Sequence, residues 1–189
     1  MIISNEFLNF LIKKKVKFFT GVPDSVLKKF LEEISKLGKK NHVEAFNEGS
    51  AVSLAIGYNL ATKKIPCVYF QNSGLGNAIN PLVSIAHPKV YSVPLLLLIG
   101  WRGSPFMKSD EPQHNVKGKI TRDILKLLGI KFLIIRTRKD FSKISKLLDF
   151  AKKNSRPIAL LVENNILKSK LELKDKKIFK VGVKRETVI

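Results

Sequence analysis

The stretch "VEAFNEGSAVSLAIGY", residues 43–58, joins a short apolar segment directly to a run of small residues. Residues 43–46 favour a β-strand, because β-branched and aromatic side chains fit a pleated, half-buried surface. Asn47 can then cap a helix whose first turn carries the carboxylate of Glu48. A strand that runs straight into a helix is the repeating unit of α/β proteins, so this junction indicates the fold class of the chain.

The same alternation of short apolar runs and longer amphipathic segments extends over the rest of the chain. Strands are predicted at 17–23, 43–46, 65–70, 93–100, 131–136 and 157–163. Helices are predicted at 6–15, 24–38, 47–58, 74–86, 118–129 and 140–154. Several strands are apolar throughout, which is typical of a parallel sheet covered by helices on both faces. The sequence therefore predicts a doubly wound α/β fold with a mostly parallel six-stranded sheet.

The length of 189 residues fits one domain, which we expect to span residues 1–165. Asp24 or Ser25 is expected to open the second helix, and Gly38 to end it. Beyond the domain the alternation fails, and the chain becomes lysine-rich. Residues 166–189 are interpreted as a basic linker or a tail that docks on another subunit.

The chain is strongly basic, with 35 Lys and Arg against 15 Asp and Glu and a formal net charge of +20. A charge of this size can indicate a partner that is a nucleic acid or an anionic lipid. However, the lysines are scattered over predicted helix faces and are not interleaved with aromatic residues. The pattern disfavours nucleic-acid binding and leaves open an acidic partner subunit or an anionic substrate.

The single cysteine, Cys67, excludes an intramolecular disulfide framework and falls in an apolar strand, where a buried thiol is expected. The apolar residues near Met1 precede the first lysines, the reverse of the order in a secretory signal peptide. The longest apolar run, at 94–100, is far shorter than the roughly 20 residues that span a bilayer. A cytoplasmic protein is therefore expected.

Four loops that follow predicted strands are unusual in composition. They are residues 20–25, 46–50, 71–77 and 100–114. Because ligands bind beyond the carboxyl ends of the strands in doubly wound sheets, these loops are expected to gather on one edge. The last loop is long for an α/β connection, which is typical of an active-site loop. Its polar side chains are Arg102, Asp110, Glu111, Gln113 and His114.

Each of these features also has a purely structural interpretation. Glu48 can stabilise a helix N-terminus by about 0.3–1 kcal/mol through the macrodipole. Gly74 and Gly76 can form a tight turn before a helix, since the dinucleotide fingerprint and the Walker lysine are both missing. His114 can be a solvent-exposed loop residue. Three histidines and one cysteine without ligand spacing predict no metal site.

Taken together, the loops resemble a known family. The order "TGVPDS", "NEGSAVSLAIGYNLATKK", "QNSGLGNAINPL" and "PLLLLIGWRG…DEPQH" resembles the N-terminal, pyrimidine-binding domain of thiamine-diphosphate-dependent 2-oxo-acid decarboxylases. Within that family the similarity is greatest to phosphonopyruvate decarboxylases, followed by the α subunits of sulfopyruvate decarboxylases. It covers about residues 3–165.

The resemblance implies a role for Glu48. In this family the glutamate at this position hydrogen-bonds N1′ of the aminopyrimidine ring and favours the tautomer that removes the C2 proton of the thiazolium. Such chemistry requires a carboxylate held in a dry, shaped pocket. The small residues after Glu48 leave room for the ring. The expected cofactor is thiamine diphosphate.

The resemblance also assigns the other loop residues by position. Asp24 corresponds to an acidic residue that faces the substrate and assists proton transfer, and His114 with Gln113 to polar side chains that close over the substrate. Arg102 could contact a phosphonate or sulfonate. The residues expected to line the cofactor are Gly74, Leu75, Gly76 and Asn77.

The sequence departs from the family in one respect, because it contains no Gly-Asp-Gly motif. In this family a second domain with that motif holds the Mg²⁺ and the diphosphate of the cofactor. The expected partners are therefore a diphosphate-binding subunit and, through the pyrimidine domain, a second copy of this chain. We expect half of an active site, in a separately encoded α subunit or a truncated copy. A non-catalytic interaction protein and a nucleic-acid binder remain alternatives of another class.

Overall fold

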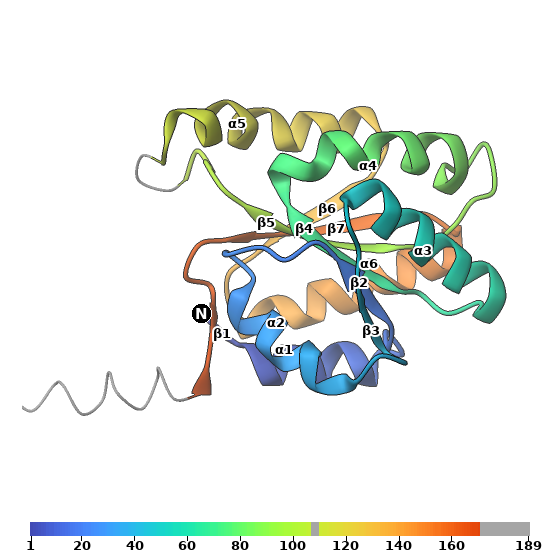
Figure 1. The fold of residues 1–189 in the computed structure, drawn as a ribbon, viewed down its shortest axis with the longest axis horizontal. Coiled ribbons are helices and arrows are strands. Elements are labelled where there is room, and N and C mark those ends of the chain that lie inside the picture. Colours follow the sequence, from blue (N-terminus) through green and yellow to red (C-terminus); the bar gives the residue numbers. More distant parts are fainter. Residues whose placement is uncertain (107–109, 171–189) are drawn as a thin grey trace, which may run out of the picture.

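The computed structural model describes residues 1–106 and 110–170, and these residues form a parallel sheet between two layers of helices (Figure 1). The strand order is β3-β2-β4-β5-β7-β6, and all neighbouring strands are parallel. The strands are β2 (Phe19–Gly21), β3 (His42–Glu44), β4 (Cys67–Gln71), β5 (Leu96–Trp101), β6 (Lys131–Ile135) and β7 (Ile158–Glu163). The predicted doubly wound fold with a six-stranded sheet is confirmed.

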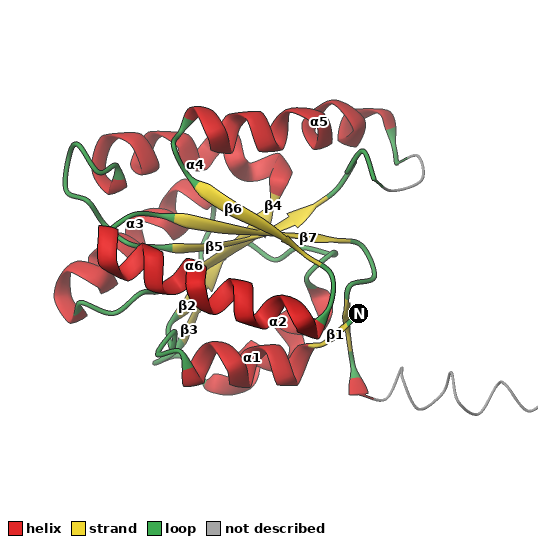
Figure 2. Ribbon diagram, turned by 180° about the vertical axis from the view of Figure 1, so that it is seen from behind, coloured by secondary structure: helices red, strands yellow, loops and turns green. Residues whose placement is uncertain are grey.

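In the described residues, helices cover both faces of the sheet (Figures 1 and 2). One face carries α1 (Ser4–Lys13), α2 (Lys28–Ile34) and α6 (Phe141–Asn154). The other carries α3 (Glu48–Thr62), α4 (Leu75–Pro81) and α5 (Pro112–Leu127). The helix α4 continues as a π-helical turn over Leu82–Ala86.

Alternating side chains of the central strands build two separate hydrophobic cores. In β4, Cys67 and Tyr69 pack against the α1 side, whereas Val68 and Phe70 pack against the α3 side. Every residue of β5 and β7 is buried. A strand covered on both faces needs apolar residues at every position, which explains the continuous apolar runs of the sequence. Cys67 is fully buried, and burial raises the pKa of its thiol, as expected of a structural cysteine.

Three predicted boundaries were wrong. The strand at 43–46 is shorter, since β3 ends at Glu44 and Phe46 is fully exposed. Neither Asp24 nor Ser25 caps α2, which begins at Lys28 after Leu27 without a side-chain cap. The helix predicted at 118–129 begins six residues earlier, because Pro112 occupies its first turn.

The segment after residue 165 contains one further strand. β8 (Leu167–Lys168) pairs in parallel with β1 (Ile2–Ile3), and Leu167 is buried in the core on the α1 side. The linker interpretation therefore does not apply to these residues, since both hydrogen bonding and burial fix them to the domain. The rest of the predicted tail, 171–189, lies outside the described residues. In the described part of the chain, no helix has both the length and the apolar character needed to cross a bilayer.

Candidate active site

The junction between β3 and α3 fixes the position of Glu48. Asn47 has extended backbone and caps α3, because its side chain accepts a hydrogen bond of 2.8 Å from the backbone N–H of Ser50. Glu48 is therefore the first residue of the helix. An added Cβ at the next residue, Gly49, would lie 2.9 Å from the carbonyl oxygen of Asn77, so the glycine allows α3 to approach α4 closely.

The Glu48 carboxylate reaches across to the turn between β4 and α4. Its Oε2 accepts a hydrogen bond of 2.8 Å from Nδ2 of Asn77. Its Oε1 lies against Gly74, where any Cβ would overlap the carboxylate. No hydrogen bond to this oxygen comes from residues 1–106 or 110–170. The site thus holds the carboxylate at one oxygen and leaves the other able to share a proton with a ligand.

A second carboxylate, Asp24, is buried at the end of β2. Its Oδ1 accepts hydrogen bonds from the amide of Gln71 (2.9 Å) and the backbone N–H of Val26 (3.2 Å). Its Oδ2 faces the backbone of Gly100 and has no hydrogen-bond partner in the part of the chain that the structure describes. Burial raises the pKa of this carboxyl group above its ordinary value of 3.8, despite the opposing bond from Gln71. Burial thus favours the protonated form of Asp24 more than it would be favoured in an exposed carboxyl group.

The raised pKa of Asp24 leads to a prediction about stability. The folded chain binds this proton more tightly than the unfolded chain, so stability falls as the pH rises from 3.8 through the folded pKa. Asp24→Asn removes the cost of ionisation and keeps the acceptor for Gln71. We expect a higher urea midpoint for the variant at pH 7 and a smaller difference near pH 4. The exposed Asp123→Asn is the control, with little change at either pH. Destabilisation by Asp24→Asn at both pH values would contradict the assignment.

The loop after β5 is held by Asn72 and by an ion pair. The buried Asn72 amide donates to Thr121 Oγ1 and to the carbonyl of Arg102, both at 3.0 Å, and accepts from the Arg102 N–H. The Arg102 guanidinium forms two bonds to Asp110, of 2.8 and 2.6 Å. This pairing holds the pKa of Asp110 well below its usual range. Arg102 is therefore already neutralised, and a substrate anion would compete with Asp110 for it.

His114 and Gln113 lie in the first turn of α5 rather than in a loop. The His114 side chain is largely buried, its Nδ1 has no hydrogen-bond partner among the described residues, and its Nε2 lies 3.9 Å from Glu111. The alternative of a solvent-exposed histidine is therefore wrong. Gln113 is exposed and hydrogen-bonds Glu111. Three predicted positions of the 100–114 loop, 107–109, lie outside the described residues.

Only some of the predicted site residues contact one another. Glu48, Gly74 and Asn77 are in direct contact, and Asp24 with Gln71 forms a neighbouring group. The side chain of Leu75 is buried in the core, so it can offer a ligand only its backbone. A Cβ at Gly76 would meet open space.

The structure adds an ion pair between a buried carboxylate and an exposed arginine that the sequence did not suggest. Glu163 ends β7 and accepts hydrogen bonds from Ser104 (2.7 Å) and from two nitrogens of Arg136 (2.8 and 3.1 Å). The only indication of this ion pair in the sequence was that Arg136 and Glu163 each end a predicted strand. Within 1–106 and 110–170, no three His, Cys, Asp or Glu side chains are grouped as metal ligands.

Comparison with known proteins places this geometry in context. Residues 1–125 match the family "Thiamine pyrophosphate enzyme, N-terminal TPP binding domain". The chain is 37% identical over 115 residues to phosphonopyruvate decarboxylase of Streptomyces viridochromogenes, covering 61% of this chain and 28% of the relative. It is 30% identical over 151 residues to sulfopyruvate decarboxylase subunit alpha of Methanothermobacter thermautotrophicus, covering 78% of this chain and 87% of the relative.

Solved structures show the same fold. Benzoylformate decarboxylase from Polynucleobacter necessarius superposes with a TM-score of 0.66 at 22% identity, over 87% of this chain and 30% of that one. The chain thus spans about a third or less of the phosphonopyruvate decarboxylases it matches, but most of the sulfopyruvate decarboxylase α subunit.

Proposed function

This chain belongs to the thiamine pyrophosphate enzymes, as their N-terminal TPP binding domain, and we propose that it forms the pyrimidine-binding half of a 2-oxo-acid decarboxylase. The single observation that carries the proposal is the position of Glu48. The first residue of α3 holds one carboxylate oxygen on Asn77 and presents the other beside a glycine that has no side chain. A helix N-terminus that served only its own stability would not need this fixed orientation.

The residues of this corner fit the aminopyrimidine of thiamine diphosphate. Glu48 would share a proton with a ring nitrogen, and Asn77 would keep the carboxylate in the orientation for that bond. Gly74 leaves the space that the carboxylate needs. When bound, the cofactor supplies the carbanion stabilisation that decarboxylation requires, while the protein positions it and excludes water.

Asp24 would act on the substrate side of this corner. Burial raises its pKa and so favours the protonated form, and Gln71 fixes one of its oxygens. Its Oδ2, which no described residue hydrogen-bonds, faces Gly100, so a rotation of the carboxyl group would be needed before it met a substrate. His114 in the first turn of α5 is the second candidate for a polar group near the substrate, since its Nδ1 has no partner within the described ranges.

We propose that the cofactor's diphosphate and Mg²⁺ bind to a partner. The carboxylates at this edge do not form a free ligand set, since Asp110 pairs with Arg102, Asp24 is buried with a raised pKa, and Glu48 is the residue proposed to contact the pyrimidine. The exposed side of α3 and α4 suits a protein interface. It combines a shallow depression lined by small and polar residues with the exposed side chains of Phe46 and Leu54. A second copy of this chain and a diphosphate-binding subunit are the proposed occupants.

Two substrates are proposed, 3-phosphonopyruvate first and sulfopyruvate second. The first is supported by the 37% identity to a phosphonopyruvate decarboxylase, the second by a relative of which the chain covers 87%. Both carry a tetrahedral anion on the carbon that is a methyl group in pyruvate. A cationic side chain can bind that anion, so discrimination against pyruvate is expected.

The substrate prediction is tested in the complex with a diphosphate-binding chain. We expect kcat/KM for the preferred anionic substrate to exceed that for pyruvate at least tenfold, equivalent to about 1.4 kcal/mol in transition-state binding. Carbon dioxide release from each 2-oxo acid provides the measurement. Comparable efficiency on pyruvate would indicate a general 2-oxo-acid decarboxylase, and the preference between phosphonate and sulfonate separates the two proposals.

A further inference from the structure

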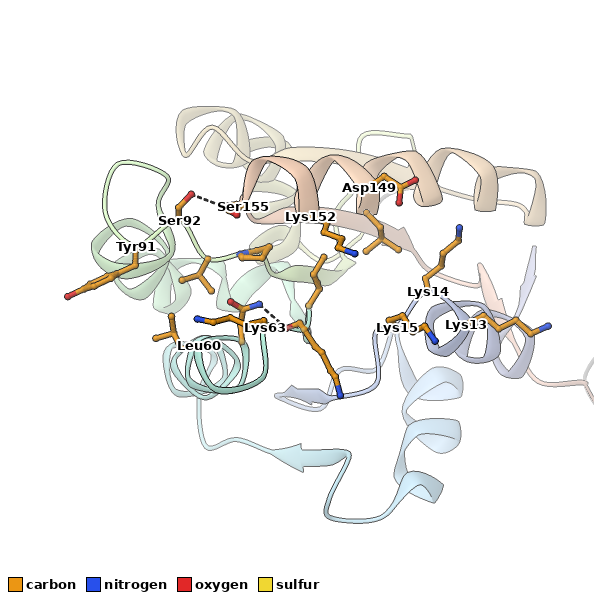
Figure 3. A pocket seen from close by; sticks show the side chains of 16 residues that line it. Lys13, Lys14, Lys15, Leu60, Lys63, Tyr91, Ser92, Asp149, Lys152 and Ser155 are labelled. Atoms are coloured by element: carbon orange, nitrogen blue, oxygen red, sulfur yellow. Dashed lines mark hydrogen bonds between the residues drawn. The ribbon is translucent and has the colours of Figure 1, made fainter.

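A pocket rich in lysine lies at the amino edge of the sheet, opposite the edge that carries Glu48. Its volume is about 660 Å³, and it is bounded by the ends of α1, α3 and α6 and by the segment before β5 (Figure 3). In Figure 3, Lys63 and Lys152 lie on opposite walls, Lys14 and Lys15 close the end near α1, and Tyr91 marks the other end. The lysines that line it are Lys13, Lys14, Lys15, Lys63, Lys64 and Lys152.

The fold explains why these lysines gather at one edge of the sheet. In a parallel α/β sheet the helices run antiparallel to the strands, so their C-termini gather at the amino edge. A lysine near a helix C-terminus is stabilised by the macrodipole. One or two lysines at each helix C-terminus would be enough for this stabilisation. The dipoles do not require that lysines from three helices line the same hollow.

The described part of the chain supplies little negative charge to the pocket. Among residues 1–106 and 110–170, Asp149 is the only acidic residue on its lining. None of the six ammonium groups forms an ion pair with a residue in 1–106 or 110–170. Like charges gathered around a concave surface repel each other and attract a multivalent anion. The pocket also has an apolar lining, which includes Leu60, Ile65 and Val93.

We propose that this pocket binds a small organic molecule that carries two or more phosphate groups. Its volume lies in the range of small-molecule sites, about 300–1,000 Å³. Lysine is a common phosphate ligand because it acts as a point charge with three donors. The apolar lining suits the organic part of such a ligand. A confined hollow between three helix ends fits a small molecule better than an extended nucleic acid.

The proposal is independent of the decarboxylase function. Glu48 lies at the carboxyl edge of the sheet, while the pocket residues Ile65 and Val93 precede β4 and β5 at the amino edge. A variant at one edge should therefore leave binding at the other unchanged. Glu48→Gln provides this separation in the experiment.

The test is calorimetric titration of the full chain with ATP and tripolyphosphate, without magnesium and at physiological salt. Lys64→Ala with Lys152→Ala removes two exposed pocket lysines. Lys39→Ala with Lys146→Ala is the matched control, since it removes the same charge from exposed positions outside the pocket. We expect the double substitution in the pocket to lower the binding affinity for both ligands at least tenfold. The control double substitution should lower it less than twofold, and Glu48→Gln should leave it unchanged. Inorganic phosphate should bind at least tenfold more weakly than tripolyphosphate.

Three results would overturn the proposal. Equal losses in the pocket pair and the control pair would mean that binding follows net charge alone. Millimolar or weaker binding of both polyphosphates would mean that the lysines serve only the helix ends. The third result is that a single-stranded oligonucleotide or a polyglutamate peptide binds more tightly than the polyphosphates and loses this binding in the pocket double variant. That result would assign the surface to a macromolecule.

Discussion

Replacing Glu48 with glutamine is expected to slow proton exchange at C2 of the bound cofactor by about a hundredfold or more, in the complex with a diphosphate-binding chain. Glutamine can still accept a hydrogen bond from Asn77, but it cannot share a proton with a ring nitrogen. The chain should remain folded, because the change removes only a helix-terminal charge worth about 0.3–1 kcal/mol. Exchange measured by NMR separates this result from a loss of cofactor binding.

Two glycine variants sharpen the same test. A Cβ at Gly74 would meet the Glu48 carboxylate, whereas one at Gly76 would meet open space. Since the Glu48 side chain can rotate away, Gly74→Ala should fold and yet displace the carboxylate, with a loss of exchange like that of Glu48→Gln. Gly76→Ala lies within α4 and meets no described atom of the chain, so it should leave the Glu48 carboxylate in place while gaining up to about 1 kcal/mol in stability. Since Gly76 is expected to line the cofactor, a loss of exchange in this variant would report contact with the cofactor and not displacement of Glu48. An exchange rate unchanged in Glu48→Gln would assign Glu48 to helix stabilisation alone.

The fold was predictable because both sheet faces are covered. Strands such as β5 are buried along their whole length, so their sequences are apolar without alternation and unlike the helices between them. The strand order could not be predicted, since it depends on which helices pack together. The pairing of β8 with β1 joins residues 2–3 to 167–168, and a two-residue strand leaves no periodic signal.

The position of Glu48 was predictable from the sequence, but its contacts were not. The strand-to-helix junction marks the carboxylate, whereas its bond to Asn77 requires α4 to lie beside α3. The same limit applies to Arg102: the sequence predicted that it could contact a substrate anion, but not that it pairs with Asp110 eight residues later. The start of α5 had a signal in Pro112, and placing Gln113 and His114 in a loop overlooked it.

The isolated chain is expected to bind thiamine diphosphate more weakly than about 0.1 mM and to decarboxylate nothing. Much of the cofactor's affinity should come from its Mg²⁺-bridged diphosphate, since Mg²⁺ requires oxygen ligands in octahedral geometry. Asp110 is paired with Arg102, and Asp24 is buried with a raised pKa, so neither offers a free carboxylate. A chain that supplies the diphosphate site should therefore raise decarboxylation at least about a thousandfold over this chain alone.

Calorimetric titration of the isolated chain with thiamine and with thiamine diphosphate, each with and without Mg²⁺, measures this division of the site. If the chain offers only the pyrimidine corner, both compounds should bind equally weakly, Mg²⁺ should have no effect, and Gly74→Ala should weaken both. The pocket variant, Lys64→Ala with Lys152→Ala, serves as the background, so that a diphosphate captured at the opposite edge of the sheet is not mistaken for the active site. Tight Mg²⁺-dependent binding on that background, or decarboxylation without a partner, would place a complete active site within this chain.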